Sequence, residues 1–160
     1  MSKILVLGLG NPILSDDGVG LRIVQELRQN IDRSDVTITE THLGGINLLE
    51  LLAGYKKAII IDAIQTKNSV SGQVYRFGPE ALDFTNHIAS SHEINFTEIL
   101  NLGRRLGLSL PDEIRIFAVE VEDITTFSEE FTDSVRKAVP LVVGMVLEEL
   151  GLSPKTLPSI

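Results

Sequence analysis

Two short segments that are almost wholly apolar, residues 3–9 and 57–64, stand out along the chain. Neither segment alternates between apolar and polar positions, which is typical of parallel strands that are covered on both faces. Between them, apolar residues at helical spacing predict helices over residues 19–27 and 46–52, and an alternating β-branched run predicts a strand at residues 36–40. We therefore expect the chain to open with a β-α-β-α-β unit.

The second half of the chain continues this alternation. Strands are predicted at residues 73–77 and 114–119, and a helix at residues 93–106 follows a polar surface loop at residues 84–91. Strands that alternate with helices favour an open, mostly parallel, twisted sheet of about five strands with helices on both faces, which is a three-layer α/β/α sandwich. Such sheets bind ligands at the carboxyl ends of their strands, near a switch in strand order.

The final helix has the clearest pattern. Thr132 is its expected N-cap, Asp133 suits its positive end, and Pro140 predicts a kink inside it. Its apolar residues recur at spacings of three and four, at Val135, Ala138, Val139, Val142, Val143, Val146 and Leu150.

The composition narrows the class of protein. A chain of 160 residues suits one α/β domain, expected over residues 1–150, with a loosely ordered tail over residues 151–160. Cysteine is absent, so carboxylates and histidine are the strong metal ligands that remain. A net charge of −8 opposes binding to nucleic acid and to anionic membranes. The lack of disulfides, of a signal-peptide pattern and of a membrane-length apolar segment predicts a cytoplasmic protein.

The glycine-rich loop after the first predicted strand, from Gly8 to Gly20, contains two adjacent carboxylates, Asp16 and Asp17. A dinucleotide-binding loop is not expected, because Ile13 occupies the place of the third glycine and the two aspartates would repel a pyrophosphate. One aspartate can cap the following helix through its side chain. The other is then a candidate oxygen ligand or base at the carboxyl end of the strand.

Two further residues point to the same edge of the sheet. Asp62 ends an apolar run and is a candidate site carboxylate, although it could also close a turn or bind a neighbouring amide. His92 precedes the helix predicted at residues 93–106, where it is either an exposed or capping histidine or a ligand. Two carboxylates and an imidazole suit a divalent metal such as zinc or nickel. His87 and His42 are second choices.

Other motifs carry less weight. Glu120 and Glu122 follow the strand predicted at residues 114–119 and could reach the same edge. The acidic pairs Glu122-Asp123 and Glu129-Glu130 are more typical of a solvated surface, however. No Gly-x-Ser-x-Gly or His-Glu-x-x-His motif occurs, so serine-hydrolase and zincin chemistry have no support here.

With these residues considered, the chain closely resembles the hydrogenase maturation endopeptidase family, which processes the large subunit of nickel–iron hydrogenases. The most specific match is Gly8-Leu9-Gly10-Asn11 followed by Asp16-Asp17-Gly18-x-Gly20, in which Asp17 takes the place of a metal-contacting acidic residue. Asp62 after Ile59-Ile60-Ile61 matches the family's second carboxylate, and Ser91-His92 matches its metal-binding histidine.

The resemblance implies a phosphorylase/hydrolase-like fold and an endopeptidase that removes the C-terminal extension of a large-subunit precursor. Nickel already installed in that precursor would be recognised by Asp17, Asp62 and His92, so the substrate supplies the metal and no organic cofactor is expected. The simplest chemistry is a metal-polarised carbonyl attacked by an activated water, with Asp16 or Asp17 as base. We expect a monomer that binds the precursor.

One departure and two alternatives remain. Many members carry an Asp-Gly-Gly-Thr-like turn, whereas this chain has Glu40-Thr41-His42-Leu43-Gly44-Gly45, so the surface that docks a particular precursor is expected to differ. The start Gly8-Leu9-Gly10-Asn11-Pro12 also resembles peptidyl-tRNA hydrolases, but the acidic residues that follow oppose RNA binding. A nickel-sensing module that binds the precursor without cutting it would use the same three ligands.

Overall fold

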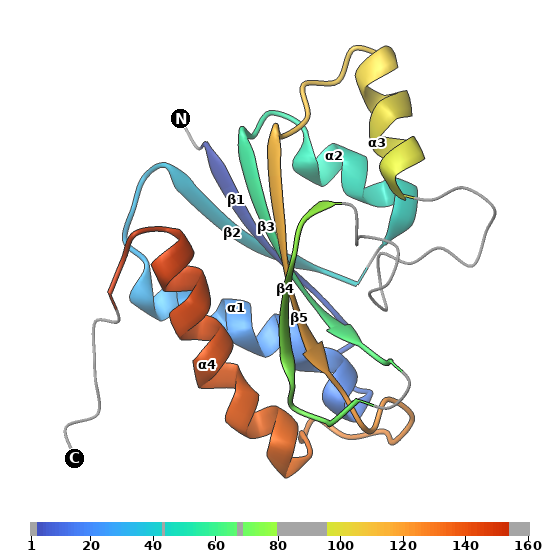
Figure 1. Ribbon diagram of the computed structural model, residues 1–160, viewed down its shortest axis with the longest axis vertical. Helices are drawn as coiled ribbons and strands as arrows, with labels where there is room; N and C mark the ends of the chain where they lie inside the picture. The colour runs from blue at the N-terminus through green and yellow to red at the C-terminus, as the bar shows by residue number, and fades with distance from the viewer. Residues whose placement is uncertain (1–2, 43, 67–68, 80–95, 154–160) are drawn as a thin grey trace.

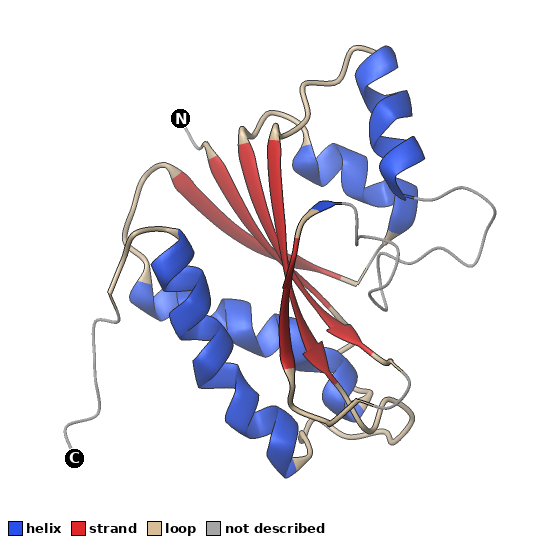
Figure 2. Ribbon diagram, in the orientation of Figure 1, coloured by secondary structure: helices blue, strands red, loops and turns tan. Residues whose placement is uncertain are grey.

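The computed structural model describes residues 3–42, 44–66, 69–79 and 96–153. Within them the chain forms a five-stranded sheet in the order β2-β1-β3-β5-β4 (Figures 1 and 2). The first four strands in this order are mutually parallel, and β4 pairs with β5 in the antiparallel direction. In chain order the strands are β1 (Ile4–Leu9), β2 (Val36–Thr41), β3 (Lys57–Ile64), β4 (Val74–Phe77) and β5 (Glu113–Glu120).

Helices cover both faces of this sheet, as Figure 1 shows. One face is covered by α1 (Val19–Asn30) and α4 (Asp133–Glu149), and the other by α2 (Leu48–Leu52) and α3 (Phe96–Arg105). The predicted three-layer α/β/α architecture is therefore confirmed.

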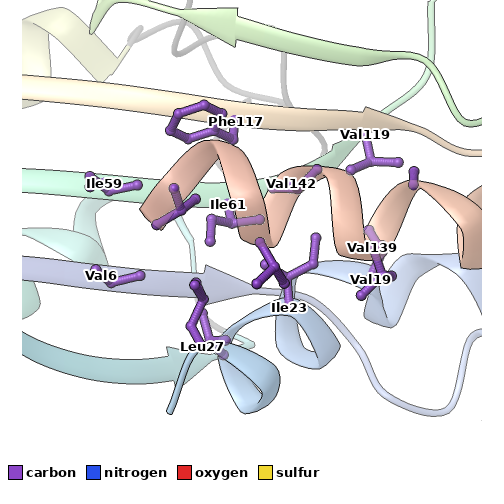
Figure 3. Close-up of a cluster of buried hydrophobic side chains, with 14 of the residues drawn as sticks. Val6, Val19, Ile23, Leu27, Ile59, Ile61, Phe117, Val119, Val139 and Val142 are labelled. Carbon is purple, nitrogen blue, oxygen red and sulfur yellow. The ribbon is translucent and has the colours of Figure 1, made fainter. Parts of the chain in front are cut away.

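Alternate residues of the central strands point into two separate cores. Val6, Ile59 and Ile61 pack against α1 and α4 together with Phe117 (Figure 3). Residues at the intervening positions, such as Leu7 and Ile60, pack against α2 and α3. Because both faces are covered, positions on both sides of these strands are mostly apolar, which explains the absence of alternation in the sequence.

The boundaries differ from the predicted ones by a few residues, for physical reasons. Ile46 lies in a 3₁₀ turn, Gly45–Asn47, ahead of α2. The edge strand β4 is antiparallel, a direction that the sequence pattern does not specify. Predictions for residues 84–91, for the start of the helix at residues 93–95 and for most of the tail lie outside the described residues. No helix of the described part is long and apolar enough to cross a membrane.

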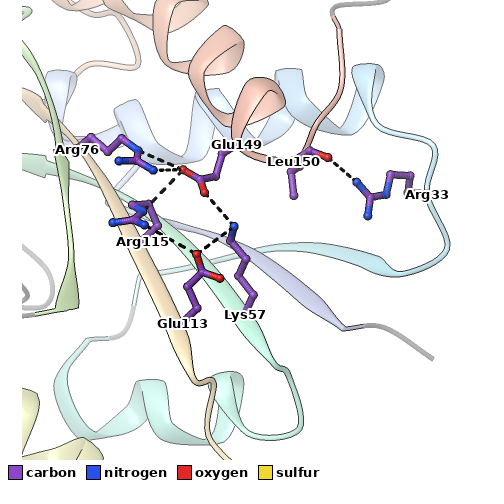
Figure 4. A network of polar contacts seen from close by, with 7 residues as sticks. All are labelled: Arg33, Lys57, Arg76, Glu113, Arg115, Glu149 and Leu150. Atoms are coloured by element: carbon purple, nitrogen blue, oxygen red, sulfur yellow. Dashed lines mark hydrogen bonds and ion pairs between the residues drawn. The ribbon is translucent and has the colours of Figure 1, made fainter.

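Polar residues fasten the end of α4 to the sheet (Figure 4). Glu149 accepts hydrogen bonds from Lys57 Nζ at 2.9 Å and from an Arg76 guanidinium nitrogen at 2.7 Å. Arg115 Nε lies 3.7 Å from the same carboxylate, and Glu113 pairs with both Lys57 and Arg115. Burial alone would raise the pKa of Glu149, but the hydrogen bonds and charges of Lys57 and Arg76 outweigh it and lower that pKa.

Candidate active site

The strand order creates a switch point at β1. This strand lies between β2 and β3, and the chain leaves its carboxyl end toward β2, while β3 is its neighbour on the other side. The loops that leave the two sides of such a point separate and open a crevice, which is where ligands of open α/β sheets bind. Asp17 lies on the loop after β1, and Asp62 lies near the carboxyl end of β3.

Glycines bring the start of α1 directly onto this edge. A Cβ atom at Gly20 would lie 2.4 Å from the Leu9 carbonyl oxygen and 2.6 Å from that of Ile61, so only glycine allows this approach. A Cβ atom at Gly10 would likewise lie 2.5 Å from the Asp17 carbonyl oxygen. Asp17 therefore packs on the end of β1. Gly20, three residues later in α1, lies against the Ile61 carbonyl of β3, next to Asp62. Both predicted carboxylates therefore belong to one edge, as expected.

Asp17 lies in a 3₁₀ turn, Ser15–Gly18, and its side chain is only 6% exposed. Asn11 N donates a hydrogen bond to Asp17 Oδ2 at 3.2 Å, which fixes the carboxylate against the loop. The N-cap of α1 is Gly18, which has no side-chain capping bond. The prediction that one of the two aspartates caps α1 is therefore wrong, because Gly18 occupies the cap position and both aspartates precede it in the 3₁₀ turn.

Asp16 is fully buried and holds a distant loop. Its carboxylate accepts hydrogen bonds from Glu122 N and Asp123 N, both at 3.0 Å, and from Thr132 N at 2.8 Å. The Thr132 hydroxyl also donates to Oδ2, at 2.9 Å. Thr132 is thus the N-cap residue of α4, but its side chain bonds Asp16 and does not cap the helix. These contacts make Asp16 a positioning residue and remove the support for its suggested role as base.

Asp62 is fully buried within β3, which continues to Ile64. It shares the sheet face of Ala58 and Ile60, toward α2 and α3. Its Oδ1 accepts a hydrogen bond from Ala63 N at 2.8 Å. The predicted contact with a neighbouring amide is therefore present. A turn at Asp62 is excluded, because the strand runs on past it.

Of the three histidines, His42 alone lies within the described residues. His92 and His87 lie outside the described residues, so the predicted convergence of His92 with Asp17 and Asp62 stays a prediction. His42 is exposed and directly follows β2, whose last residue, Thr41, accepts a hydrogen bond from Gly10 N at 3.2 Å. Among the described residues no three acidic or histidine side chains are grouped so as to hold a metal ion.

Glu120 is also a buried residue of this edge, although its sequence context is more typical of a solvated surface. Its carboxylate accepts hydrogen bonds from Thr66 N at 2.8 Å, from the Thr66 hydroxyl at 2.7 Å and from the Tyr75 hydroxyl at 3.1 Å. It therefore anchors the segment that follows β3, just beyond Asp62. Its position at the end of an apolar strand was the available signal, and the acidic residues after it obscured that signal.

The fold and this edge define an α/β protein with two buried carboxylates at the switch point of its sheet. A family model described as hydrogenase maturation protease matches residues 21–149. The "Hydrogenase 2 maturation protease" of Escherichia coli strain K12 is 34% identical over 125 residues, covering 76% of this chain and 75% of that protein. The chain belongs to the hydrogenase maturation protease family, and we describe it as a peptidase on that basis.

Solved structures agree with this assignment. The hydrogenase maturating endopeptidase HybD from E. coli superposes with a TM-score of 0.76 at 30% identity, over 96% of this chain and 98% of HybD. A hydrogenase 2 maturation peptidase from a Thaumarchaeota archaeon gives a TM-score of 0.69 at 26% identity, over 95% of this chain and all of that one. The family expected from the motifs is confirmed, and the peptidyl-tRNA hydrolase alternative loses its basis.

Proposed function

We propose that this peptidase removes the C-terminal extension of a hydrogenase large-subunit precursor, and that nickel carried by the precursor is the recognition element. The observation that carries the proposal is the pair of buried carboxylates, Asp17 and Asp62, at the switch point of a chain from this family. The E. coli relative is named as a maturation protease for hydrogenase 2, which supports a hydrogenase subunit as the substrate.

The proposed nickel ligands are Asp17, Asp62 and His92. Carboxylate oxygens and a neutral imidazole suit a borderline divalent ion, and three protein ligands leave positions for groups of the precursor and for water. Burial favours such an ion, because two carboxylates that share a site repel each other unless a cation lies between them. The bound ion would polarise the scissile carbonyl. Asp17, on the loop after β1, is the proposed base that activates the attacking water.

Processing of a precursor tests this proposal. The purified protein is incubated with nickel-loaded and nickel-free large-subunit precursors of its own organism, and loss of the C-terminal peptide is read by mass spectrometry. We expect cleavage of the loaded form alone. Asp17→Asn, Asp62→Asn and His92→Ala should each lower the rate at least about 100-fold, because each removes a ligand.

Asp112→Asn is the matched control, because Asp112 is an exposed carboxylate at the opposite end of β5. Equal cleavage of both precursor forms would reject nickel recognition. A wild-type rate for Asp17→Asn would remove Asp17 from the mechanism. Tight binding without cleavage would replace the peptidase by a nickel-sensing binding module. Action as a cytoplasmic monomer stays a prediction, and light scattering on the purified protein tests the oligomeric state.

A further inference from the structure

Two large apolar side chains are exposed beside the candidate site. Phe127 is 81% exposed on the loop between β5 and α4, and Ile13 is 51% exposed on the loop after β1. The two loops pair along their backbones: Ser128 N donates to the Ile13 carbonyl at 2.9 Å, and Ser15 N donates to the Ser128 carbonyl at 2.8 Å. Phe127 and Ile13 therefore belong to one surface, which we call the Phe127 rim.

The Phe127 rim is held in place by buried polar contacts. Asp16 accepts the backbone hydrogen bonds described above from the first and last parts of the same loop, and the Ser15 hydroxyl donates to the Glu130 carbonyl at 2.8 Å. Ser15 itself has a φ of 47°, a left-handed conformation that is costly for a non-glycine residue. A loop fixed in this way presents an exposed phenylalanine with little ordering cost on binding, as expected of an interface.

A groove of about 350 Å³ lies beside the Phe127 rim. Its walls come from the loop after β1, from α1 and from the loop before α4, and include Pro12, Gly18, Leu21, Glu129 and Phe131. Gly18, which lines the groove, directly follows Asp17 in the chain, so the groove is built partly from the loop that carries this carboxylate.

The charge of this surface indicates the charge of the partner that it can bind. Glu122, Glu129 and Glu130 are exposed, and none of them forms an ion pair within the described part of the chain. Residues 121–132 contain no lysine or arginine. Two arginines adjoin this surface, but Arg22 lies over the Phe131 ring, 5.8 Å from its centroid, and Arg136 pairs with Asp133 at 2.7 Å. A partner therefore complements this surface best when it brings its own positive charge.

We infer that the Phe127 rim and the adjoining groove dock a segment of the protein substrate in which an apolar side chain is flanked by lysine or arginine. The apolar side chain packs against Phe127 and Ile13, and the basic side chains pair with Glu129 and Glu130. This inference rests on the proposed function for the identity of the substrate. It adds a docking surface that is built partly from the loop that carries Asp17.

The test compares Phe127→Ala with Leu141→Ala, a control on the exposed face of α4 where the side chain is 61% exposed. Affinity for the nickel-loaded precursor and the kinetics of its processing are measured separately. Phe127→Ala should weaken binding and lower kcat/KM at least about tenfold, mainly through KM. Leu141→Ala should match the wild type, and thermal melting should show both variants folded.

The double variant Glu129→Gln with Glu130→Gln should weaken binding and flatten its dependence on salt. Wild-type binding and kinetics in both the phenylalanine and the glutamate variants would overturn the inference, even if processing itself is confirmed. Binding that depends on Phe127 without any cleavage would support the surface and reject the peptidase activity. A wild-type protein that does not bind the precursor, or a dimer that Phe127→Ala dissociates, would also overturn the inference.

Discussion

Asp16 and Asp17 are neighbours in sequence with different surroundings. Each oxygen of Asp16 is engaged by donors from the loop before α4, whereas Asp17 is 6% exposed and accepts a hydrogen bond from Asn11 N within its own loop. A carboxylate that is saturated with internal donors holds structure, and one that lies beside a crevice can meet a substrate. The order of the two residues therefore matters more than the number of acidic groups in the loop.

Asp16→Ala should lower the free energy of unfolding by about 2–4 kcal/mol, because the backbone amides of Glu122, Asp123 and Thr132 lose their acceptor. Asp16→Asn should cost less, since one acceptor oxygen remains. Urea denaturation at pH 7 measures both, with Asp112→Ala as an exposed control that changes stability by less than about 0.5 kcal/mol. If Asp16→Ala unfolds like the wild type, the loop is held by other contacts.

For single residues, the sequence could predict where Asp17 and Asp62 lie, but not which residues contact Asp16 and Glu120. Both follow from strand ends, which apolar patterning reveals locally. The partners of Asp16 are 106 to 116 residues away in the chain, so no local pattern reveals them. Glu120 is similar, because its partner Thr66 is 54 residues away.

At the scale of elements, the layers follow from the handedness of the crossovers. The connection from β1 to β2 runs in one direction along the sheet, and the connections from β2 to β3 and from β3 to β5 run in the other. Right-handed crossovers then place α1 on one face and both α2 and α3 on the other, as observed. The sequence could therefore predict the three layers. It could not predict that β4 adds antiparallel to β5, because a four-residue edge strand pairs equally well by pattern in either direction.

Gly20→Ala tests how closely α1 must approach the sheet. Its new methyl group would meet two backbone carbonyl oxygens, so we expect a loss of at least about 3 kcal/mol in unfolding free energy and displacement of the Asp17 loop. The matched control is Gly144→Ala in α4, where a Cβ atom meets nothing within 4 Å. That variant should gain about 0.5–1 kcal/mol, because alanine is the better helix former. Equal stabilities in thermal melts would show that α1 can shift without cost.

At the scale of the whole molecule, charges are divided between the two ends of the sheet. The carboxylates of the candidate site lie at the carboxyl ends of the strands, as do Glu122, Glu129 and Glu130 beside the Phe127 rim. The paired cations Lys57 and Arg115 lie near the start of β3 and β5, where they face Glu149 and Glu113. Glu122, Glu129 and Glu130 are exposed at the carboxyl end and form no ion pair within the described residues, so they attract a basic partner to that end, whereas the ion pairs of Glu149 at the other end hold α4 to the sheet.

The Glu149 cluster predicts how stability depends on pH. The pKa of Glu149 is lowered in the folded protein, so its contribution to stability is present above the unfolded value of about 4.3 and is lost as the pH falls through the folded value. Glu149→Gln should lower the free energy of unfolding by about 1–2 kcal/mol at pH 7, because Lys57 and Arg76 lose a charged acceptor. The gap to the wild type should narrow in urea titrations below about pH 4.3. Glu129→Gln, which removes an exposed carboxylate, should show no such narrowing, and a gap that is constant from pH 7 to pH 3 would mean that the cluster holds α4 by packing alone.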